Sequence, residues 1–165
     1  MKKLENTNIK FFNLIAGGYD FLFGNWIRGT QRKAIMIIRI KNNSKILDAG
    51  CGTGNLLEIL ENYGKKLDLY GIGISEKMLK IARKKLKKSS LQIKPVEKPG
   101  FEDSFFNYVF SVDAFHHYSN QNLAMKNFYR ILKTNGSLAV IDLNFGSFFN
   151  KIFQKIEPGN NKLLS

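Results

Sequence analysis

The chain has 165 residues, of which 44% are hydrophobic, and this size and composition fit one domain with its own core. No run of about 18 consecutive apolar residues occurs, which argues against a spanning helix, and the polar start at 1–10 lacks the apolar centre of a secretory signal. We therefore expect a cytoplasmic protein. The formal net charge of +13, from 26 Lys and Arg against 13 Asp and Glu, makes nucleic acid and anionic membrane surfaces candidate partners.

Apolar periodicity predicts a helical amino-terminal region followed by alternating strands and helices. Residues 8–40 are apolar at mixed helical spacing and are interrupted by glycines, which predicts two or three short helices. The elements expected after them are a strand at 45–49, a helix at 53–63, a strand at 67–74, a helix at 77–88, strands at 91–96 and 108–112, a helix at 120–132 and, after a turn at Asn135-Gly136, a strand at 137–143. The strands are apolar throughout, which is typical of a parallel sheet covered on both faces. The sequence thus predicts a single domain at 1–165, with a helical N-terminal cap at 1–40 and an α/β core at 41–165.

The helix expected at 77–88 carries much of the excess positive charge. Seven Lys and Arg residues surround an apolar set there, which is typical of an amphipathic helix with a solvated basic face. Ser75 is the expected N-cap of this helix. A surface that binds polyanions stays open as the alternative interpretation.

One segment of the sequence carries chemistry. It reads I-L-D-A-G-C-G-T-G at 46–54 and begins in the first strand of the core. In an open parallel sheet, ligands bind beyond the carboxyl ends of the strands. The alternating Gly50, Gly52 and Gly54 remove side chains where the chain turns sharply, which lets a bulky ligand approach the backbone, and the next helix directs free amide groups toward it. The spacing is not the G-x-G-x-x-G of dinucleotide enzymes.

The stretch L-D-A-G-C-G-T-G-N at 47–55 closely resembles the first motif of class I S-adenosylmethionine-dependent methyltransferases. Residues 13–35, which contain A-G-G-Y-D, are similar to the segment before the fold in ubiquinone/menaquinone and phospholipid methyltransferases. The remaining similarities are Y-G-I-G-I-S-E-K-M-L at 70–79, F-E-D at 101–103, F-N-Y-V at 106–109, H-H at 116–117 and Y-R-I-L-K at 129–133. The resemblance implies a doubly wound, mostly parallel sheet of the Rossmann-like methyltransferase type.

The resemblance also implies S-adenosylmethionine as the cofactor. Its methionine end would lie over 50–54, with Asp48 supporting the loop or the amino group, its adenosine end near 73–78, and its ammonium at the carbonyl of Ser111. The expected cofactor-binding residues are Asp48, Gly50, Cys51, Gly52, Gly54, Gly73, Ser75, Met78, Val96, Glu97 and Ser111. The reaction would be displacement at the methyl carbon of a sulfonium, for which a protein mainly supplies alignment and exclusion of water.

Four positions lack an acidic residue that the family pattern contains. Gly73 stands where the family usually has an acid that binds the ribose hydroxyls, and Pro95 stands where it has an aspartate near the adenine; Asn107 and Asn127 carry amides. A charge-assisted hydrogen bond is worth on the order of 1.5–3 kcal/mol, so each loss in the site would weaken cofactor binding roughly ten- to a hundredfold. A weakened or inactive relative that keeps the fold is therefore an open hypothesis.

Beyond the fifth strand, the family continues with a helix and a terminal strand hairpin, whereas this chain ends at Ser165. We expect the fold to lack that hairpin and to expose one edge of the sheet. An unprotected edge invites association, so a homodimer is a candidate assembly.

The sequence does not fix a catalytic residue, but Tyr19 and His117 are candidates. Tyr19 lies in a segment that folds over the cofactor in the resembling proteins, with packing on the core as its alternative, and His117 is expected near the acceptor. His116 and His117 would point about 100° apart on a helix and lack further ligands at metal spacing, so no metal is expected. Cys51, the single cysteine, is expected to be an ordinary loop residue in a reducing compartment.

Two aromatic groups suggest a hydrophobic partner. Phe11, Phe12, Tyr19, Phe21, Phe23 and Trp26 form either a cap over a hydrophobic acceptor or the packing of the N-terminal helices. The second group, with Lys151 and Lys155 between its members, makes peripheral membrane contact a further prediction. It comprises Phe145, Phe148, Phe149 and Phe153.

The leading hypothesis is methyl transfer from S-adenosylmethionine to a small, lipid-like or quinone-like acceptor. The alternative is a non-catalytic methyltransferase-like domain whose basic surface binds nucleic acid or an anionic membrane. Nucleic acid as the methyl acceptor is disfavoured, though still open, because S-V-D-A-F at 111–115 replaces the N/D-P-P-Y/F signature of many such enzymes.

Overall fold

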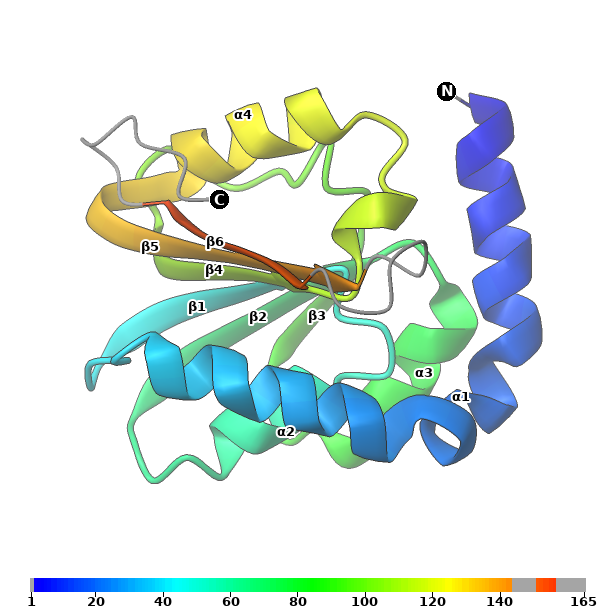
Figure 1. The fold of residues 1–165 in the computed structure, drawn as a ribbon, viewed down its shortest axis with the longest axis horizontal. Helices are drawn as coiled ribbons and strands as arrows, with labels where there is room; N and C mark the ends of the chain where they lie inside the picture. The colour runs from blue at the N-terminus through cyan, green and yellow to red at the C-terminus, as the bar shows by residue number, and fades with distance from the viewer. Residues whose placement is uncertain (1, 144–150, 157–165) are drawn as a thin grey trace.

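The protein folds around a six-stranded, doubly wound sheet (Figure 1). This computed structural model describes residues 2–143 and 151–156. The elements are α1 (Lys2–Ile37), β1 (Ser44–Ala49), α2 (Asn55–Glu61), β2 (Leu67–Gly73), α3 (Glu76–Lys85), β3 (Ser90–Ile93), β4 (Phe106–Val112), a 3-10 turn (Phe115–His117), α4 (Gln121–Ile131), β5 (Leu132–Leu143) and β6 (Lys151–Ile156). The strand order is β3-β2-β1-β4-β5-β6, with β1 to β5 parallel and β6 antiparallel to β5. The predicted fold class is therefore confirmed.

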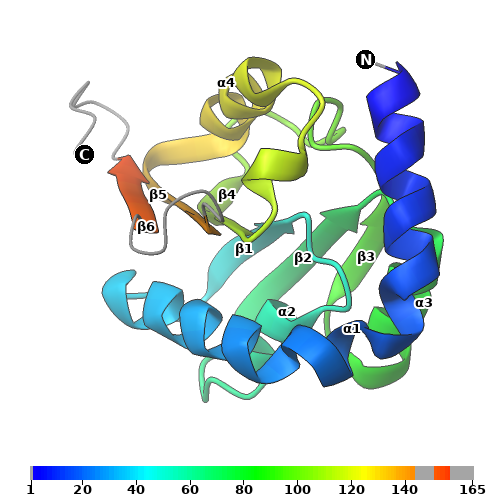
Figure 2. The same cartoon turned by 45° about the vertical axis from the view of Figure 1, so that its right-hand side comes forward.

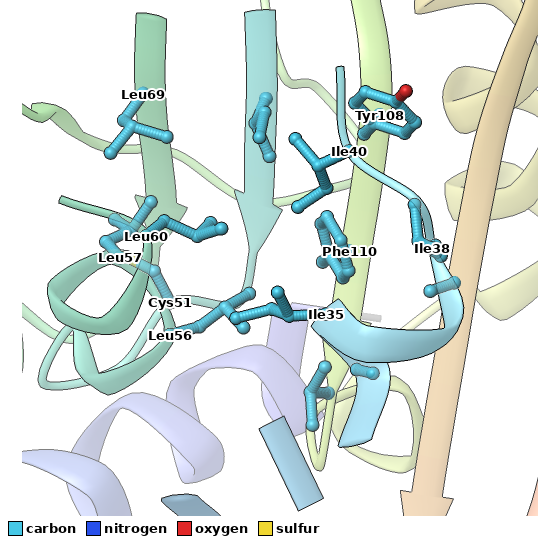
Figure 3. Close-up of a cluster of buried hydrophobic side chains, with 14 of the residues drawn as sticks. Ile35, Ile38, Ile40, Cys51, Leu56, Leu57, Leu60, Leu69, Tyr108 and Phe110 are labelled. Atoms are coloured by element: carbon cyan, nitrogen blue, oxygen red, sulfur yellow. The ribbon is translucent and has the colours of Figure 1, made fainter. Parts of the chain in front are cut away.

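Helices cover both faces of the sheet, so the central strands β1 and β4 are buried on both sides. In Figure 1, α4 lies on one face, and α2, α3 and the second half of α1 lie on the other. Ile46 of β1 packs in the cluster beneath α1 and α2, whereas the next residue, Leu47, packs in the cluster beneath α4. Figure 3 shows the first cluster, where Ile35 and Ile38 from the end of α1 meet Phe110 of β4. Each such side chain contributes about 1.5–3 kcal/mol on burial, and this is why the strands are apolar throughout.

The N-terminal region differs from its sequence prediction. Instead of two or three short helices, it forms the single helix α1, which Figure 1 shows bent into two arms. A glycine inside a helix costs about 1 kcal/mol relative to alanine, and Gly17, Gly18 and Gly29 do not end the helix here. Packing of Ala34 and Ile35 in the core provides tertiary stabilisation that local propensity does not report.

The C-terminal edge of the sheet also differs. The predicted turn at Asn135 lies inside β5, where Asn135 has φ 67° and the register with β4 shifts between the pairs Phe106–Leu132 and Tyr108–Ser137. Beyond it, β6 pairs with β5 from Leu138 to Leu143. The sheet therefore does not end at its fifth strand, as was expected, because β6 pairs with β5 and forms the edge on this side. Phe145, Phe148 and Phe149 lie outside the described residues, and the structure describes only the backbone of Phe153.

None of the helices in the described part of the chain combines the length and apolar character needed to cross a bilayer.

Candidate functional site

A cleft opens at the carboxyl ends of the parallel strands. The chain runs outward from β1 to β2 and β3 and then crosses to β4 on the other side of β1, so this is the switch point at which open α/β sheets bind ligands. The carboxyl ends of the strands point toward the N-terminal arm of α1 in Figure 2. The empty space, which is continuous with open solvent, is about 760 Å³. The lining residues include Asn8, Phe12 and Tyr19 of α1, Gly50, Gly52, Gly73, Ser75, Met78, Lys94 to Glu97, Asp113, Ala114 and His117 to Ser119.

The glycine turn after β1 forms the floor of this cleft. Gly50, Gly52 and Gly54 all have positive φ, at 82°, 49° and 79°, a region that favours glycine. Gly50 and Gly52 line the cleft, and the amides of Gly50 and Cys51 both donate to the carbonyl of Ile72 at 2.9 Å. Backbone hydrogen bonds thus hold the end of β1 against β2, and the turn presents bare backbone to the open space.

Gly54 has a different role from the one the sequence suggested. It lies outside the cleft lining, and a Cβ there would stand 2.8 Å from Leu86 Cδ1 and 3.0 Å from Ala82 Cβ. Gly54 is therefore needed because helix α2 begins in contact with α3 and not because a ligand approaches it. Both reasons apply to Gly50: it lines the cleft, and a Cβ added there would lie 2.7 Å from Ala114 Cβ.

Tyr118 stabilises the start of the turn by contacts with the ends of two strands. Its buried hydroxyl donates to the carbonyl of Ala49 at 2.8 Å and lies 2.7 Å from Ser111 Oγ, so it joins the ends of β1 and β4. Burial raises the pKa of Tyr118 far above its usual value, and the phenol stays protonated. Ser111 is fully buried and lies outside the cleft lining. The predicted role of its carbonyl in holding an ammonium group stays a prediction.

The side of the cleft next to β2 and α3 is mainly apolar. Gly73 ends β2, and the sulfur of Met78 in α3 lies 3.8 Å from where a Cβ on Gly52 would lie. Ser75 lines the cleft and caps α3, as predicted, by accepting from the Met78 amide at 3.2 Å. The sequence did not single out Lys94, a half-buried cation on the same wall.

The loop after β3 supplies Val96 and Glu97 to the lining. One carboxylate oxygen of Glu97 accepts from Ser119 Oγ at 2.8 Å and from the Asn120 amide at 3.0 Å. Glu97 therefore fastens this loop to the start of α4 as well as facing the open space. Pro95 also lines the cleft, at the position where the family pattern has an acid.

Two predicted binding residues are buried behind the turn and do not line the cleft. Asp48 is nearly inaccessible, and desolvation raises its pKa to about 7. Burial likewise raises the pKa of the Cys51 thiol well above its ordinary value, so the thiol is protonated at neutral pH. A protonated, buried thiol is a poor nucleophile, and this agrees with the view of Cys51 as an ordinary loop residue.

The side facing α1 carries the candidate catalytic residues. Phe12 meets the ring of His117 edge to face, with centroids 4.8 Å apart, and Asn8 Nδ2 donates to the His117 carbonyl at 2.8 Å. Burial and then the neighbouring His116 lower the pKa of His117 to about 4, so its imidazole is neutral at pH 7. Burial and then Asp113 raise the pKa of Tyr19, which keeps its phenol protonated. Tyr19 and His117 thus line the same cleft, and their catalytic role stays a prediction.

A polar network that the sequence analysis missed ties α1 to the glycine loop. Asp20 accepts from Thr53 Oγ1 at 2.6 Å and from Asn55 Nδ2 at 2.9 Å, and it pairs with Lys85 at 3.2 Å. The hydrogen bonds and Lys85 lower the pKa of Asp20 despite its partial burial. Nothing local in the sequence indicates these contacts, because Asp20 is 33 residues from Thr53 and 65 residues from Lys85.

Comparison with known proteins assigns this arrangement to a family. Residues 47–140 match the methyltransferase domain family. The chain is 28% identical over 159 residues to the demethylmenaquinone methyltransferase of Thermotoga maritima, covering 92% of this chain and 69% of that protein. It is also 28% identical over 167 residues to the ubiquinone/menaquinone biosynthesis C-methyltransferase UbiE of Geotalea daltonii, covering 90% and 71%.

A solved structure shares the fold. The methyltransferase bound to the Trm112 activator of Haloferax volcanii superposes with a TM-score of 0.74 at 22% identity. The match covers 79% of this chain but only 59% of that one. The described chain therefore corresponds to somewhat more than half of that structure.

Proposed function

This chain belongs to the methyltransferase domain family and is a class I S-adenosylmethionine-dependent methyltransferase, and we propose that it methylates a small, quinone-like acceptor held against the aromatic wall formed by α1 and His117. The observation that supports the proposal most directly is the shape of the cleft. Bare backbone at Gly50 and Gly52 lies on one side, and Phe12, Tyr19 and His117 lie on the other. Both relatives described above carry quinone-related names.

The lining residues fit the cofactor. S-adenosylmethionine supplies an electrophilic methyl group on a sulfonium. Gly50 and Gly52 leave backbone in contact with the open space, and Met78 and Val96 offer apolar surface for a flat base. Alignment of the reactants and exclusion of water are the main contributions that a protein makes to such a displacement.

On the acceptor side, the chain supplies aromatic surface and a neutral proton acceptor. A quinol ring packs well against Phe12 and His117, since edge-to-face aromatic pairs contribute about 0.5–1.5 kcal/mol beyond their burial. Methylation at a ring carbon requires that carbon to lose a proton. The imidazole of His117, neutral at pH 7, takes up a proton there, while Tyr19 keeps its own. Asp113 also lines the cleft and lies close enough to Tyr19 to raise the pKa of that phenol.

Two departures from the family pattern limit the affinity for cofactor. Gly73 offers no carboxylate where the ribose would lie, and Pro95 offers neither an acid nor an amide donor. We therefore expect weak cofactor binding, with a dissociation constant higher than in relatives that keep the acid. The absence of these two groups lowers the affinity for the cofactor and does not change the residues on the acceptor side of the cleft.

The test is methyl transfer from methyl-labelled S-adenosylmethionine to a short-chain demethylmenaquinol, followed by chromatography of the product. We expect a labelled C-methyl product, whose yield falls at least tenfold in His117→Ala. The Tyr129→Ala variant, changed on the exposed face of α4, serves as the control. Cofactor binding by calorimetry without any labelled product would contradict the proposed acceptor class.

A second candidate function is a non-catalytic domain that holds a polyanion. The exposed basic residues of α3 support it, as does the absence of the acid at Gly73. Absence of calorimetric heat at millimolar S-adenosylmethionine, together with a gel shift that salt abolishes, would favour this function over methyl transfer.

A further inference from the structure

Along part of its length, the N-terminal arm of α1 turns polar side chains toward the protein and apolar side chains toward solvent. Its polar residues face the protein: Asn13 Oδ1 accepts from Ser75 Oγ at 2.7 Å, and Asp20 pairs with Lys85. Between residues 11 and 22, every exposed residue is a glycine or a large apolar side chain. The apolar stripe consists of Phe11, Leu14, Phe21 and Leu22, which are 50%, 82%, 92% and 67% exposed.

Such a stripe is not ordinary surface composition. Single apolar residues on a surface are common, but a contiguous exposed set marks a site of interaction with a protein, ligand or membrane. The face turned toward water on a solvated helix normally carries charged or polar residues, and here it carries none between residues 11 and 22. The stripe is therefore expected to be covered in the working state.

A basic surface lies directly beside the stripe. Helix α3 packs against α1, and the two helices lie side by side in Figures 1 and 2. Lys77, Lys80 and Lys84 repeat at helical spacing on α3 and are all exposed. The contacts of Asn13 with Ser75 and of Asp20 with Lys85 fix the apolar stripe and the basic surface relative to each other.

The stripe also connects to the interior of the cleft. The ring of Phe11 packs edge to face on Phe12, with centroids 5.4 Å apart, and Phe12 packs on His117 at 4.8 Å. Phe12 and His117 line the cleft, whereas Phe11 is half exposed. An unbroken run of aromatic contacts therefore leads from the outer surface of α1 to the acceptor side of the site.

From these features we propose that the N-terminal arm of α1 and the basic surface of α3 dock the protein on an anionic lipid bilayer. The stripe enters the apolar boundary of the lipid, and the lysines bind anionic head groups. Surface helices that combine a hydrophobic face with Lys or Arg bind membranes in this way. As far as the acceptor is concerned, the inference rests on the proposed function: a lipid-soluble quinol then passes along Phe11 and Phe12 into the cleft.

The exposed apolar side chains favour a bilayer over nucleic acid as the occupant. A phosphate backbone is bound by cations and, in single strands, by aromatic platforms. Leu14 and Leu22 offer it neither, while both gain by burial in hydrocarbon. The net charge of +13 is common to both partners and does not discriminate between them.

The test is sedimentation with vesicles of phosphatidylcholine alone or of phosphatidylcholine mixed with the anionic lipid phosphatidylglycerol. We expect the full chain to bind the anionic vesicles and to lose most of that binding in about 0.5 M salt, because screening shortens the range of the lysine charges. Failure to bind anionic vesicles at low salt would overturn the inference.

Two variants separate the apolar and basic contributions. Leu14→Glu/Phe21→Glu is expected to weaken vesicle binding at least tenfold. Lys80→Glu/Lys84→Glu should weaken it by more than roughly twenty-fivefold, since each lysine near the surface accounts for about fivefold and each glutamate adds repulsion. The matched controls on the opposite face of the sheet, Tyr129→Glu and Lys126→Glu, should bind as the wild type does. Circular dichroism establishes that each variant folds, and because Lys80 and Lys84 are exposed, the second variant keeps the test valid if the first unfolds.

Binding that survives the Leu14→Glu/Phe21→Glu change would contradict docking through α1. Binding of a single-stranded RNA that depends on Lys80 and Lys84 but not on Leu14 or Phe21 would assign the surface to nucleic acid instead. Failure of this inference is distinguishable from failure of the proposed function. The former abolishes vesicle binding and leaves methylation of a water-soluble quinol intact, whereas the latter abolishes methylation and leaves vesicle binding intact.

Discussion

Restoring a carboxylate at the end of β2 should strengthen cofactor binding, and the structure shows that there is room for it. A Cβ on Gly73 would find its nearest neighbours, Cys51 Sγ and the Gly52 amide, at 3.9 and 4.0 Å, which are ordinary contact distances. Gly73 is not in the left-handed region, so a side chain meets no backbone strain. An added charge-assisted hydrogen bond contributes about 1.5–3 kcal/mol. We therefore expect Gly73→Asp to bind S-adenosylmethionine roughly ten- to a hundredfold more tightly.

Isothermal titration calorimetry of the wild type and Gly73→Asp with S-adenosylmethionine measures this gain. Gly73→Asn is the matched control, because it has nearly the same shape without the charge, and it should recover only a small part of the effect. An unchanged or lower affinity in a folded Gly73→Asp protein would refute the placement of the ribose beside this strand end.

Three further substitutions test how the turn is built. Asp48→Asn should remove a pH dependence: burial raises the pKa of Asp48 from 3.8 to about 7, so the wild type loses stability as the pH rises from about 4 to 7 and loses little more above it. Denaturant titrations at pH 5 and pH 8 should show the wild type losing roughly 2–3 kcal/mol relative to the variant, and parallel curves would argue against the raised pKa. Gly54→Ala should cost roughly 2–4 kcal/mol, because its Cβ would collide with α3 at positive φ; a melting temperature equal to wild type would contradict that packing. Tyr118→Phe should cost roughly 1–3 kcal/mol, since the Ala49 carbonyl and the Ser111 hydroxyl lose a buried partner; an unchanged free energy of unfolding would show that these contacts are dispensable.

The glycine turn and the strands around it could be predicted because their causes are local. Three alternating glycines directly after an apolar strand require a turn at positive φ, and Ser75 before an amphipathic segment predicts the helix cap that is observed. These features depend on residues a few positions apart. The doubly wound, mostly parallel sheet followed from the resemblance and from strands that are apolar throughout.

What could not be predicted depends on contacts between distant residues. The glycines of α1 do not end the helix because its C-terminal part packs in the core, and Tyr118 reaches the carbonyl of Ala49 across 69 residues. The need for a glycine at position 54 also comes from distant residues, Ala82 in α3 and Leu86 at its C-terminal end. Sequence reasoning assigned that glycine to the ligand because a side-chain collision cannot be seen from spacing alone. The strand β6 was not predicted, because the aromatic residues at 145–153 were interpreted as a surface group and the resemblance implied that the sheet ends at its fifth strand.

The most direct test of the site is a crystal structure of the protein with S-adenosylhomocysteine, the demethylated form of the cofactor. We predict ligand density over the backbone of Gly50 and Gly52, with the ribose beside Gly73 and the sulfur facing the wall of Phe12, Tyr19 and His117. Density elsewhere in the molecule, or an empty cleft at a ligand concentration that saturates binding in solution, would contradict the assignment of this cleft as the methyl-transfer site.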